Sequence, residues 1–168
     1  LEIDFKDMLN PVITGSGAER NKQITQFTEG GFYLPRYSLW NEFQTQEEFD
    51  QVLEKAYQER LGRYKEYVQK YQPSDEVKQY IADVLKADYY QALFFHLNQF
   101  AYNQHKEIDI HRYTDRLQEA SHLLDNRTIT GTFFGMAELM YNYLHLLNDR
   151  FWKGDKSLTL AEVMEPLK

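Results

Sequence analysis

The sequence predicts an all-α fold, an irregular helical bundle, and three observations lead to this prediction. Long stretches carry apolar side chains at three- and four-residue spacing, which is the period of an α-helix. Ser/Thr-x-x-Glu capping boxes, which mark helix starts, occur at Ser16, Thr45 and Thr159. Alternating patterns typical of strands are nearly absent. We expect one domain over residues 1–168, with two short helices and four long ones at about 46–71, 75–104, 110–125 and 132–152.

The N-terminal segment Leu1–Phe5 alternates apolar and charged side chains, as a strand does. Because so short a strand cannot form a sheet without a hairpin partner, two interpretations stay open. The segment is either a frayed end or the last strand of an upstream β-domain, of which residues 1–15 would be a remnant. The chain does not begin with Met, so we expect either a fragment or a mature chain whose leader and any preceding segment are missing. A break over Asn10–Gly17 then precedes a short helix from the Ser16 capping box to about Phe27.

An irregular aromatic segment, Phe32–Phe43, follows. We interpret it as a lid whose aromatic side chains pack over a helix pair, with a ligand groove as the alternative. The Thr45 capping box opens the clearest amphipathic helix of the chain. Gly62 costs roughly 1 kcal/mol inside this helix, so we expect it to permit a close helix crossing. The predicted buried stripe consists of Phe49, Val52, Leu53, Ala56, Tyr57, Leu61, Tyr64, Val68 and Tyr71.

The stretch 75–104 is expected to be the central helix of the fold. Pro73 ends the preceding helix and Ser74 caps the new one, so the two helices should be antiparallel neighbours. Between Ala92 and Tyr102, nearly every direction around the helix axis carries an aromatic or aliphatic side chain. A helix that is apolar all round must be wrapped by other elements.

Two further helices complete the predicted core. The stretch 110–125, capped by Asp109, has a narrow apolar stripe and should be an outer helix. The stretch 132–152 is apolar almost all round and should be the second core helix. Its predicted inner stripe consists of Phe133, Met136, Ala137, Met140, Leu144, Leu147 and Phe151. A short helix from Thr159 to Pro166 is expected last.

Composition excludes several function classes. The chain has no cysteine, which removes thiol catalysis, thiolate metal sites and disulfides. A formal net charge of −7 disfavours binding to nucleic acid or to anionic membranes. No apolar run is long enough to span a membrane.

Asp88 is the polar residue that looks most like a site, because it lies within the apolar stripe of the central helix. A buried carboxylate costs several kcal/mol unless it is paired. We favour a structural pair across the core, with a Tyr hydroxyl, an Arg or His145 as the partner. The alternative is a general acid with a raised pKa.

The histidines form no metal-binding motif, because His-Glu-x-x-His is missing. His96 and His145 lie on the two predicted core helices, where they would approach each other or Asp88. Di-iron bundles carry Glu-x-x-His on two helices, whereas this chain has it once, at Glu119–His122. Gly15-Ser16-Gly17 lacks the Lys-Ser/Thr of a phosphate loop and is typical of a turn at a helix start. We therefore assign no catalytic, cofactor-binding or metal-ligating residue and expect no cofactor. The five histidines are His96, His105, His111, His122 and His145.

The segment Thr14-Gly15-Ser16-Gly17-Ala18-Glu19-Arg20-Asn21, followed by a long Phe/Tyr-rich helical stretch, resembles one family. It is similar to the helical accessory region of bacterial extracytoplasmic proteins that end in a thioredoxin-like thiol-disulfide oxidoreductase domain. There, a strand and a Gly-x-Gly-Ala-type turn lead into helices that separate an N-terminal β-domain from the thioredoxin-like domain. The resemblance implies that Leu1–Phe5 ends that β-domain. Because Cys-x-x-Cys is missing, it implies the accessory part without the redox domain, and no catalytic residue is carried over.

Three functions are hypotheses at this point. The first, which we favour, is a non-catalytic interaction or spacer domain of a larger extracytoplasmic bacterial protein, in the periplasm or at the cell surface. It would contact a neighbouring domain of the same polypeptide or a protein partner. The second is a ligand-binding helical domain in which Phe32–Phe43 and Trp152 line an aromatic groove for a carbohydrate or another small molecule. This hypothesis requires Trp40 or Trp152 to be partly exposed. The third is a hydrolase-type enzyme that uses Asp88 and a histidine.

Overall fold

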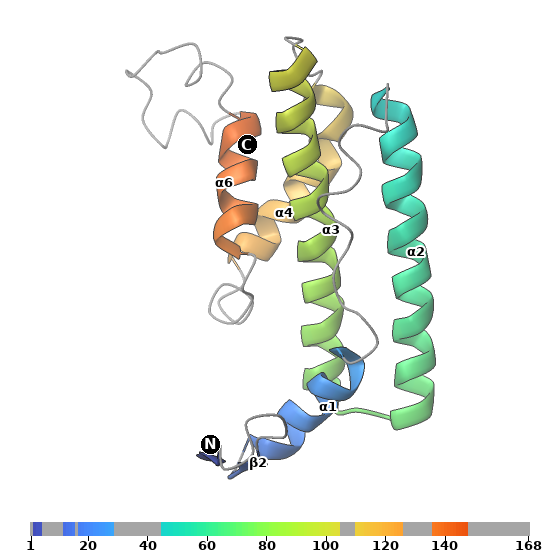
Figure 1. Cartoon of the computed structure of the whole chain (residues 1–168), viewed down its shortest axis with the longest axis vertical. Helices are drawn as coiled ribbons and strands as arrows, with labels where there is room; N and C mark the ends of the chain where they lie inside the picture. Colours follow the sequence, from blue (N-terminus) through green and yellow to red (C-terminus); the bar gives the residue numbers. More distant parts are fainter. Residues whose placement is uncertain are drawn as a thin grey trace.

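The computed structural model describes residues 2–4, 12–15, 17–28, 45–104, 110–125 and 136–147. Helices dominate this part of the chain, so the predicted all-α bundle is confirmed in its coarse form (Figure 1). The helix count differs from the prediction, because the expected helix at 110–125 begins as a 3₁₀ turn and the expected helix at 159–166 lies outside the described residues. The helical elements are α1 (Ala18–Thr28), α2 (Gln46–Tyr71), α3 (Asp75–Gln104), η1 (Ile110–Tyr113), α4 (Thr114–Asp125) and α6 (Met136–Leu147).

The antiparallel pair of α2 and α3 has the boundaries that the capping residues predict. The Glu48 backbone N–H donates to Thr45 Oγ1 at 3.2 Å, which caps α2. At its other end, Gln72 adopts a left-handed conformation with φ 46°, and its N–H donates to the Val68 carbonyl at 3.0 Å. Ser74 Oγ then accepts from the Val77 N–H at 3.4 Å, which starts α3 two residues after α2 is closed.

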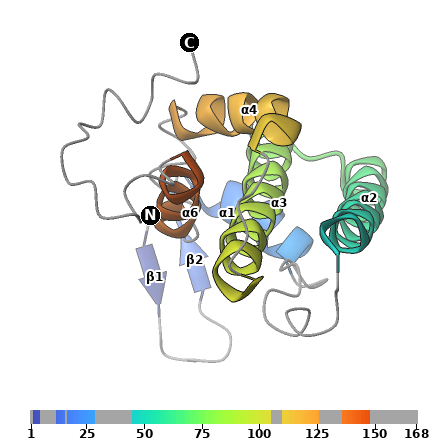
Figure 2. The same ribbon diagram turned by 90° about the horizontal axis from the view of Figure 1, so that it is seen from above.

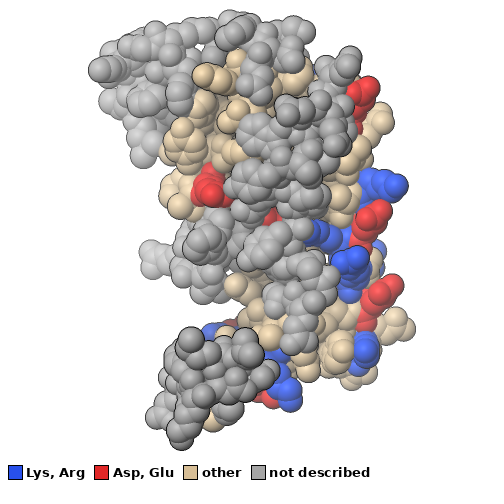
Figure 3. All heavy atoms as spheres, viewed as in Figure 1, with Lys and Arg blue, Asp and Glu red and all other residues tan. Residues whose placement is uncertain are grey.

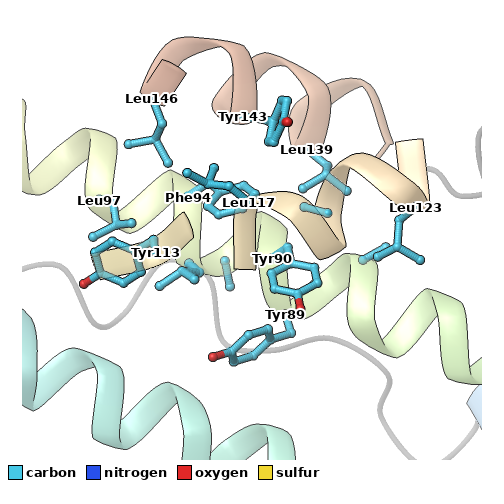
Figure 4. Close-up of a cluster of buried hydrophobic side chains, with 14 of the residues drawn as sticks. Tyr89, Tyr90, Phe94, Leu97, Tyr113, Leu117, Leu123, Leu139, Tyr143 and Leu146 are labelled. Atoms are coloured by element: carbon cyan, nitrogen blue, oxygen red, sulfur yellow. The ribbon is translucent and has the colours of Figure 1, made fainter. Parts of the chain in front are cut away.

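α3 is the centre of the fold, as predicted. It lies between α2 on one side and α6 on the other, and α4 crosses it (Figures 1 and 2). Its side chains are buried on almost every side between Val84 and Asn98. Figure 4 shows Phe94 and Leu97 of α3 meeting Leu139, Tyr143 and Leu146 of α6. Each fully buried Leu or Phe side chain contributes about 1.5–3 kcal/mol, so this cluster carries much of the stability of the fold.

A second apolar cluster lies at the other end of the α2–α3 pair, where α1 covers it. Tyr67 is buried there: its ring packs against Phe27 at 5.3 Å, and its hydroxyl donates to the Gln23 carbonyl at 2.7 Å. The predicted stripe of α2 omitted Tyr67 and was wrong at two members, because Val52 is 39% exposed and Tyr71 is 44% exposed. The difference arises from tertiary packing. α1 covers one flank of α2, and the apolar periodicity within α2 does not show which flank is covered.

A two-stranded antiparallel sheet at the N-terminal end corrects the expectation that Leu1–Phe5 has no partner. β1 (Glu2–Asp4) pairs with β2 (Val12–Thr14), and Ile3 lies opposite Ile13. The partner lies within the segment Asn10–Gly17 that we interpreted as a break. The β-branched run of β2 favours a strand, although Pro and Gly flank it.

The turn after β2 starts α1, as the sequence predicts. Gly15 has φ 96°, a conformation that favours glycine, and its carbonyl accepts from the Ala18 N–H at 3.0 Å. The Asn21 side chain donates to the Gly17 carbonyl at 2.8 Å, which ties the first turn of α1 to this loop. The Gly15 and Gly17 carbonyls are therefore part of a helix start.

The buried face of α6 matches the predicted stripe only in part, since Leu144 and Leu147 pack against the core as predicted. Leu139, Tyr143 and Leu146 face the core, whereas Met140 is 45% exposed and Tyr141 is 60% exposed. Periodicity could not select the face, because α6 is apolar almost all round. The contact with α3 instead includes a polar residue, Asn142, that the predicted inner stripe left out.

Gly62 does not mark a close helix crossing, which corrects a second expectation. Among the described residues, a Cβ atom built on Gly62 would meet nothing within 4 Å beyond its chain neighbours and the backbone of its own helix. The glycine therefore costs helix stability, and no contact in the described part of the chain requires it.

Replacing Gly62 by Ala is expected to raise the free energy of unfolding by about 0.5–1 kcal/mol, because α2 would lose less backbone entropy on folding. Chemical denaturation with urea measures this difference. A lower stability for Gly62→Ala would mean that another element approaches α2 at this position.

Charged side chains are interspersed on the surface. Figure 3 shows Lys and Arg alternating with Asp and Glu along the edge formed by α2. This agrees with charges spread along solvated helix faces. Among the described helices, none combines the length and the apolar character that a membrane span requires.

Candidate functional site

Asp88 is buried at the interface of α2 and α3 and is only 1% exposed. Its Oδ2 lies 3.2 Å from Nη1 of Arg60, which α2 contributes, and the two side chains form a hydrogen-bonded ion pair. The antiparallel hairpin places Arg60 opposite Asp88, and the Arg60 side chain is itself largely buried. The sequence analysis expected a Tyr hydroxyl, an Arg or His145 as the partner of Asp88, and the structure shows an arginine, Arg60.

This ion pair favours the structural interpretation of Asp88. Removing two charges from water costs several kcal/mol for each ion, and only close pairing offsets this cost. A carboxylate engaged in this way joins α2 to α3 and orients their contact. The pair is one of the polar contacts that join α2 to α3, and it lies about halfway along α3.

The histidines whose side chains the structure describes, His96, His122 and His145, do not form one site. His96 is buried on α3, and its ring stacks on Phe49 of α2 at 3.4 Å with an interplanar angle of 12°. Burial lowers the pKa of His96 to about 4. Asp88 precedes His96 on the same helix by a distance of about 12 Å along the axis, so the two side chains belong to different layers of the core.

His145 lies on α6, where its ring contacts Tyr141 at 5.5 Å. Burial lowers the pKa of His145 to about 4 as well. Both imidazoles are therefore neutral at neutral pH; His96 is a buried side chain, whereas His145 is half-buried. His122 is exposed on α4, His105 lies outside the described residues, and nothing is described of the His111 side chain.

A tyrosine–carboxylate cluster, which the sequence did not predict, joins α2, α3 and the η1–α4 segment. Its hydroxyls bond to carboxylates: Tyr113 Oη donates to Asp50 Oδ2 at 3.1 Å, and Tyr89 Oη donates to Glu54 Oε2 at 3.2 Å. Burial raises the pKa of Tyr89 and of Tyr113, so both hydroxyls stay protonated and remain donors. The members of the cluster are Gln46, Asp50, Glu54, Tyr89, Tyr113 and Arg116.

Arg116 completes this cluster from α4. Its guanidinium carbon lies 5.9 Å from the ring centre of Tyr89 and 5.7 Å from that of Tyr113, in cation–π geometry. Burial raises the pKa of Asp50, and the Tyr113 hydrogen bond and the Arg116 charge oppose this rise. Within the described part of the chain, Asp50 Oδ1 is buried without a hydrogen-bond partner. The cluster holds η1 and α4 against α2 through charge and hydrogen bonds rather than through apolar contact alone.

Replacing Tyr113 by Phe is expected to lower the free energy of unfolding by about 1–2 kcal/mol, because Asp50 would lose a buried donor and Gln46 an acceptor. Thermal and urea unfolding measure the loss. Tyr102→Phe is the matched control, since Tyr102 is 75% exposed and should tolerate the same change. Equal stabilities for the two variants would show that the cluster does not hold η1 to α2.

Glu119, from the single Glu-x-x-His motif, belongs to a different contact. Its Oε2 accepts from Tyr90 Oη at 2.7 Å and from Lys86 Nζ at 3.4 Å, and both donors lie on α3. Hydrogen bonding to Tyr90 is the main cause that lowers the pKa of Glu119. No group of three or more His, Asp or Glu side chains within the described ranges is arranged to hold a metal ion.

Polar side chains also join α3 to α6. The Gln91 amide donates to the Glu138 carboxylate, and the Asn98 amide donates to Oδ1 and to the carbonyl oxygen of Asn142, at 3.1 Å and 3.0 Å. Gln91, Asn98 and Asn142 are all buried. Buried amide pairs of this kind specify helix register at a cost in stability. They give α6 a defined position along α3.

Several sequence-derived candidates fall outside the described residues: the aromatic segment Phe32–Phe43, including Trp40, and Trp152. The described candidates divide among separate contacts, since Asp88 pairs with Arg60, whereas His96 stacks on Phe49. Arg60 and the tyrosine–carboxylate cluster carried no sequence signal, because their partners are far apart in the chain. No protein-family model, curated protein or solved structure shows significant similarity to this chain.

Proposed function

We propose that this chain is a non-catalytic helical interaction and spacer domain of a larger extracytoplasmic bacterial protein. The observation that carries the proposal is the position of the outer elements along α3. Near the start of α3, α1 is joined by the ion pair of Arg20 with Glu76 at 2.7 Å. Towards the end of α3, α6 is joined at Asn98. At 1.5 Å for each residue, Glu76 and Asn98 are about 33 Å apart along the helix axis.

This separation suits a spacer, because the sheet and α1 lie at one end of the molecule and α6 lies beside the other half of α3 (Figure 1). A single continuous helix joins the two regions, and α2 braces it along its length. Segments attached to the two regions would therefore be held apart by a stiff element.

The use of buried polar groups also supports a non-catalytic role. The Asp88 carboxylate is engaged by Arg60, and the carboxylates of Asp50 and Glu54 are engaged by tyrosine hydroxyls. In each case the polar contact joins two helical elements. Holding the helices together is therefore a sufficient role for these polar side chains.

The proposed extracytoplasmic compartment and the proposed neighbouring domain rest on the resemblance of Thr14–Asn21 to the accessory region described above. On this proposal, a thioredoxin-like domain in the same polypeptide is the expected neighbour, and a protein partner is the other kind of contact. On the same proposal, thiol chemistry would belong to that neighbour, since this chain has no cysteine.

Fractionation of the source cells, followed by immunoblotting with an antibody against this chain, tests the proposal. We expect a polypeptide well above 20.1 kDa in the extracytoplasmic fraction. Mass spectrometry of that band should identify a Cys-x-x-Cys peptide. A band of 20.1 kDa in the cytoplasmic fraction would contradict the proposal.

A further inference from the structure

We draw no further inference here: the strongest candidate, the outward apolar face of α6 formed by Ala137, Met140 and Tyr141, carries no proposal because nothing in the described part of the chain shows what covers it.

Discussion

Replacing Asp88 by Asn is expected to lower the free energy of unfolding by about 3–5 kcal/mol, because the largely buried guanidinium of Arg60 would lose the charge of the carboxylate that it contacts. The change keeps the size of the side chain, so the loss reports the charge rather than a cavity. Urea unfolding followed by circular dichroism measures it. If Asp88→Asn is too unstable for a urea titration, thermal unfolding still ranks its stability against that of the parent.

Two further variants separate the ion pair from general effects. Asp75→Asn is the matched control on the same helix, because Asp75 pairs with Lys78 at the surface and this variant should lose much less stability. The double variant Arg60→Met with Asp88→Leu should recover most of the loss, since an apolar pair of similar volume removes both charges. A stability for Asp88→Asn close to that of the parent would contradict the structural role of this pair.

Acidification is expected to destabilise the fold through His96. Its pKa is about 4 in the folded state and 6.5 as the ordinary value, so the unfolded chain takes up the proton first as the pH falls. The stabilising contribution of the neutral imidazole is complete above about pH 6.5 and is lost between about pH 6.5 and pH 4. From about pH 7 to about pH 4.5, the loss from His96 amounts to about 2–3 kcal/mol.

The variant His96→Phe tests this expectation, because phenylalanine keeps a ring to stack on Phe49 but does not titrate. Its stability, measured by urea unfolding at several pH values, should fall less steeply than that of the parent. His122→Phe serves as the control, since it makes the same replacement at an exposed position. Identical pH profiles for the parent and His96→Phe would refute a destabilising protonation at this position.

The sequence predicted the long hairpin well because local chemistry determines it. Thr45 and Ser74 supply capping oxygens, and Pro73 stops one helix before the next begins. The continuous apolar surface of α3 required surrounding elements, and α2, α4 and α6 provide them. These signals lie within a few residues of the feature that they predict.

Features that depend on distant residues could not be predicted in the same way. Tyr67 is buried because α1 covers it, and α6 turns Asn142 rather than Met140 to the core because Asn98 lies opposite. In both cases the apolar periodicity within the helix indicated the wrong face. β2 was missed for a related reason, since its neighbouring Pro and Gly suggested a loop.

The candidate site shows the same difference between features that local sequence predicts and features that depend on distant residues. A carboxylate in an apolar stripe indicated that Asp88 needed a partner, but only the pairing of α2 with α3 identifies Arg60. The tyrosine–carboxylate cluster gave no signal, because Tyr113 and Asp50 are 63 residues apart in the chain. Hydroxyl–carboxylate contacts follow from the packing of α4 and cannot be obtained from spacing.

The distance between spin labels on α1 and α6 tests most directly the claim that α3 holds two regions of the chain apart. The chain of residues 1–168 has no cysteine, so Lys22→Cys and Tyr141→Cys, both at exposed positions, introduce the only labelling sites in it. Double electron–electron resonance should give one narrow distribution centred at roughly 30 Å, the axial separation of the two attachment points on α3. A broad distribution, or a peak below roughly 20 Å, would contradict a stiff helical spacer.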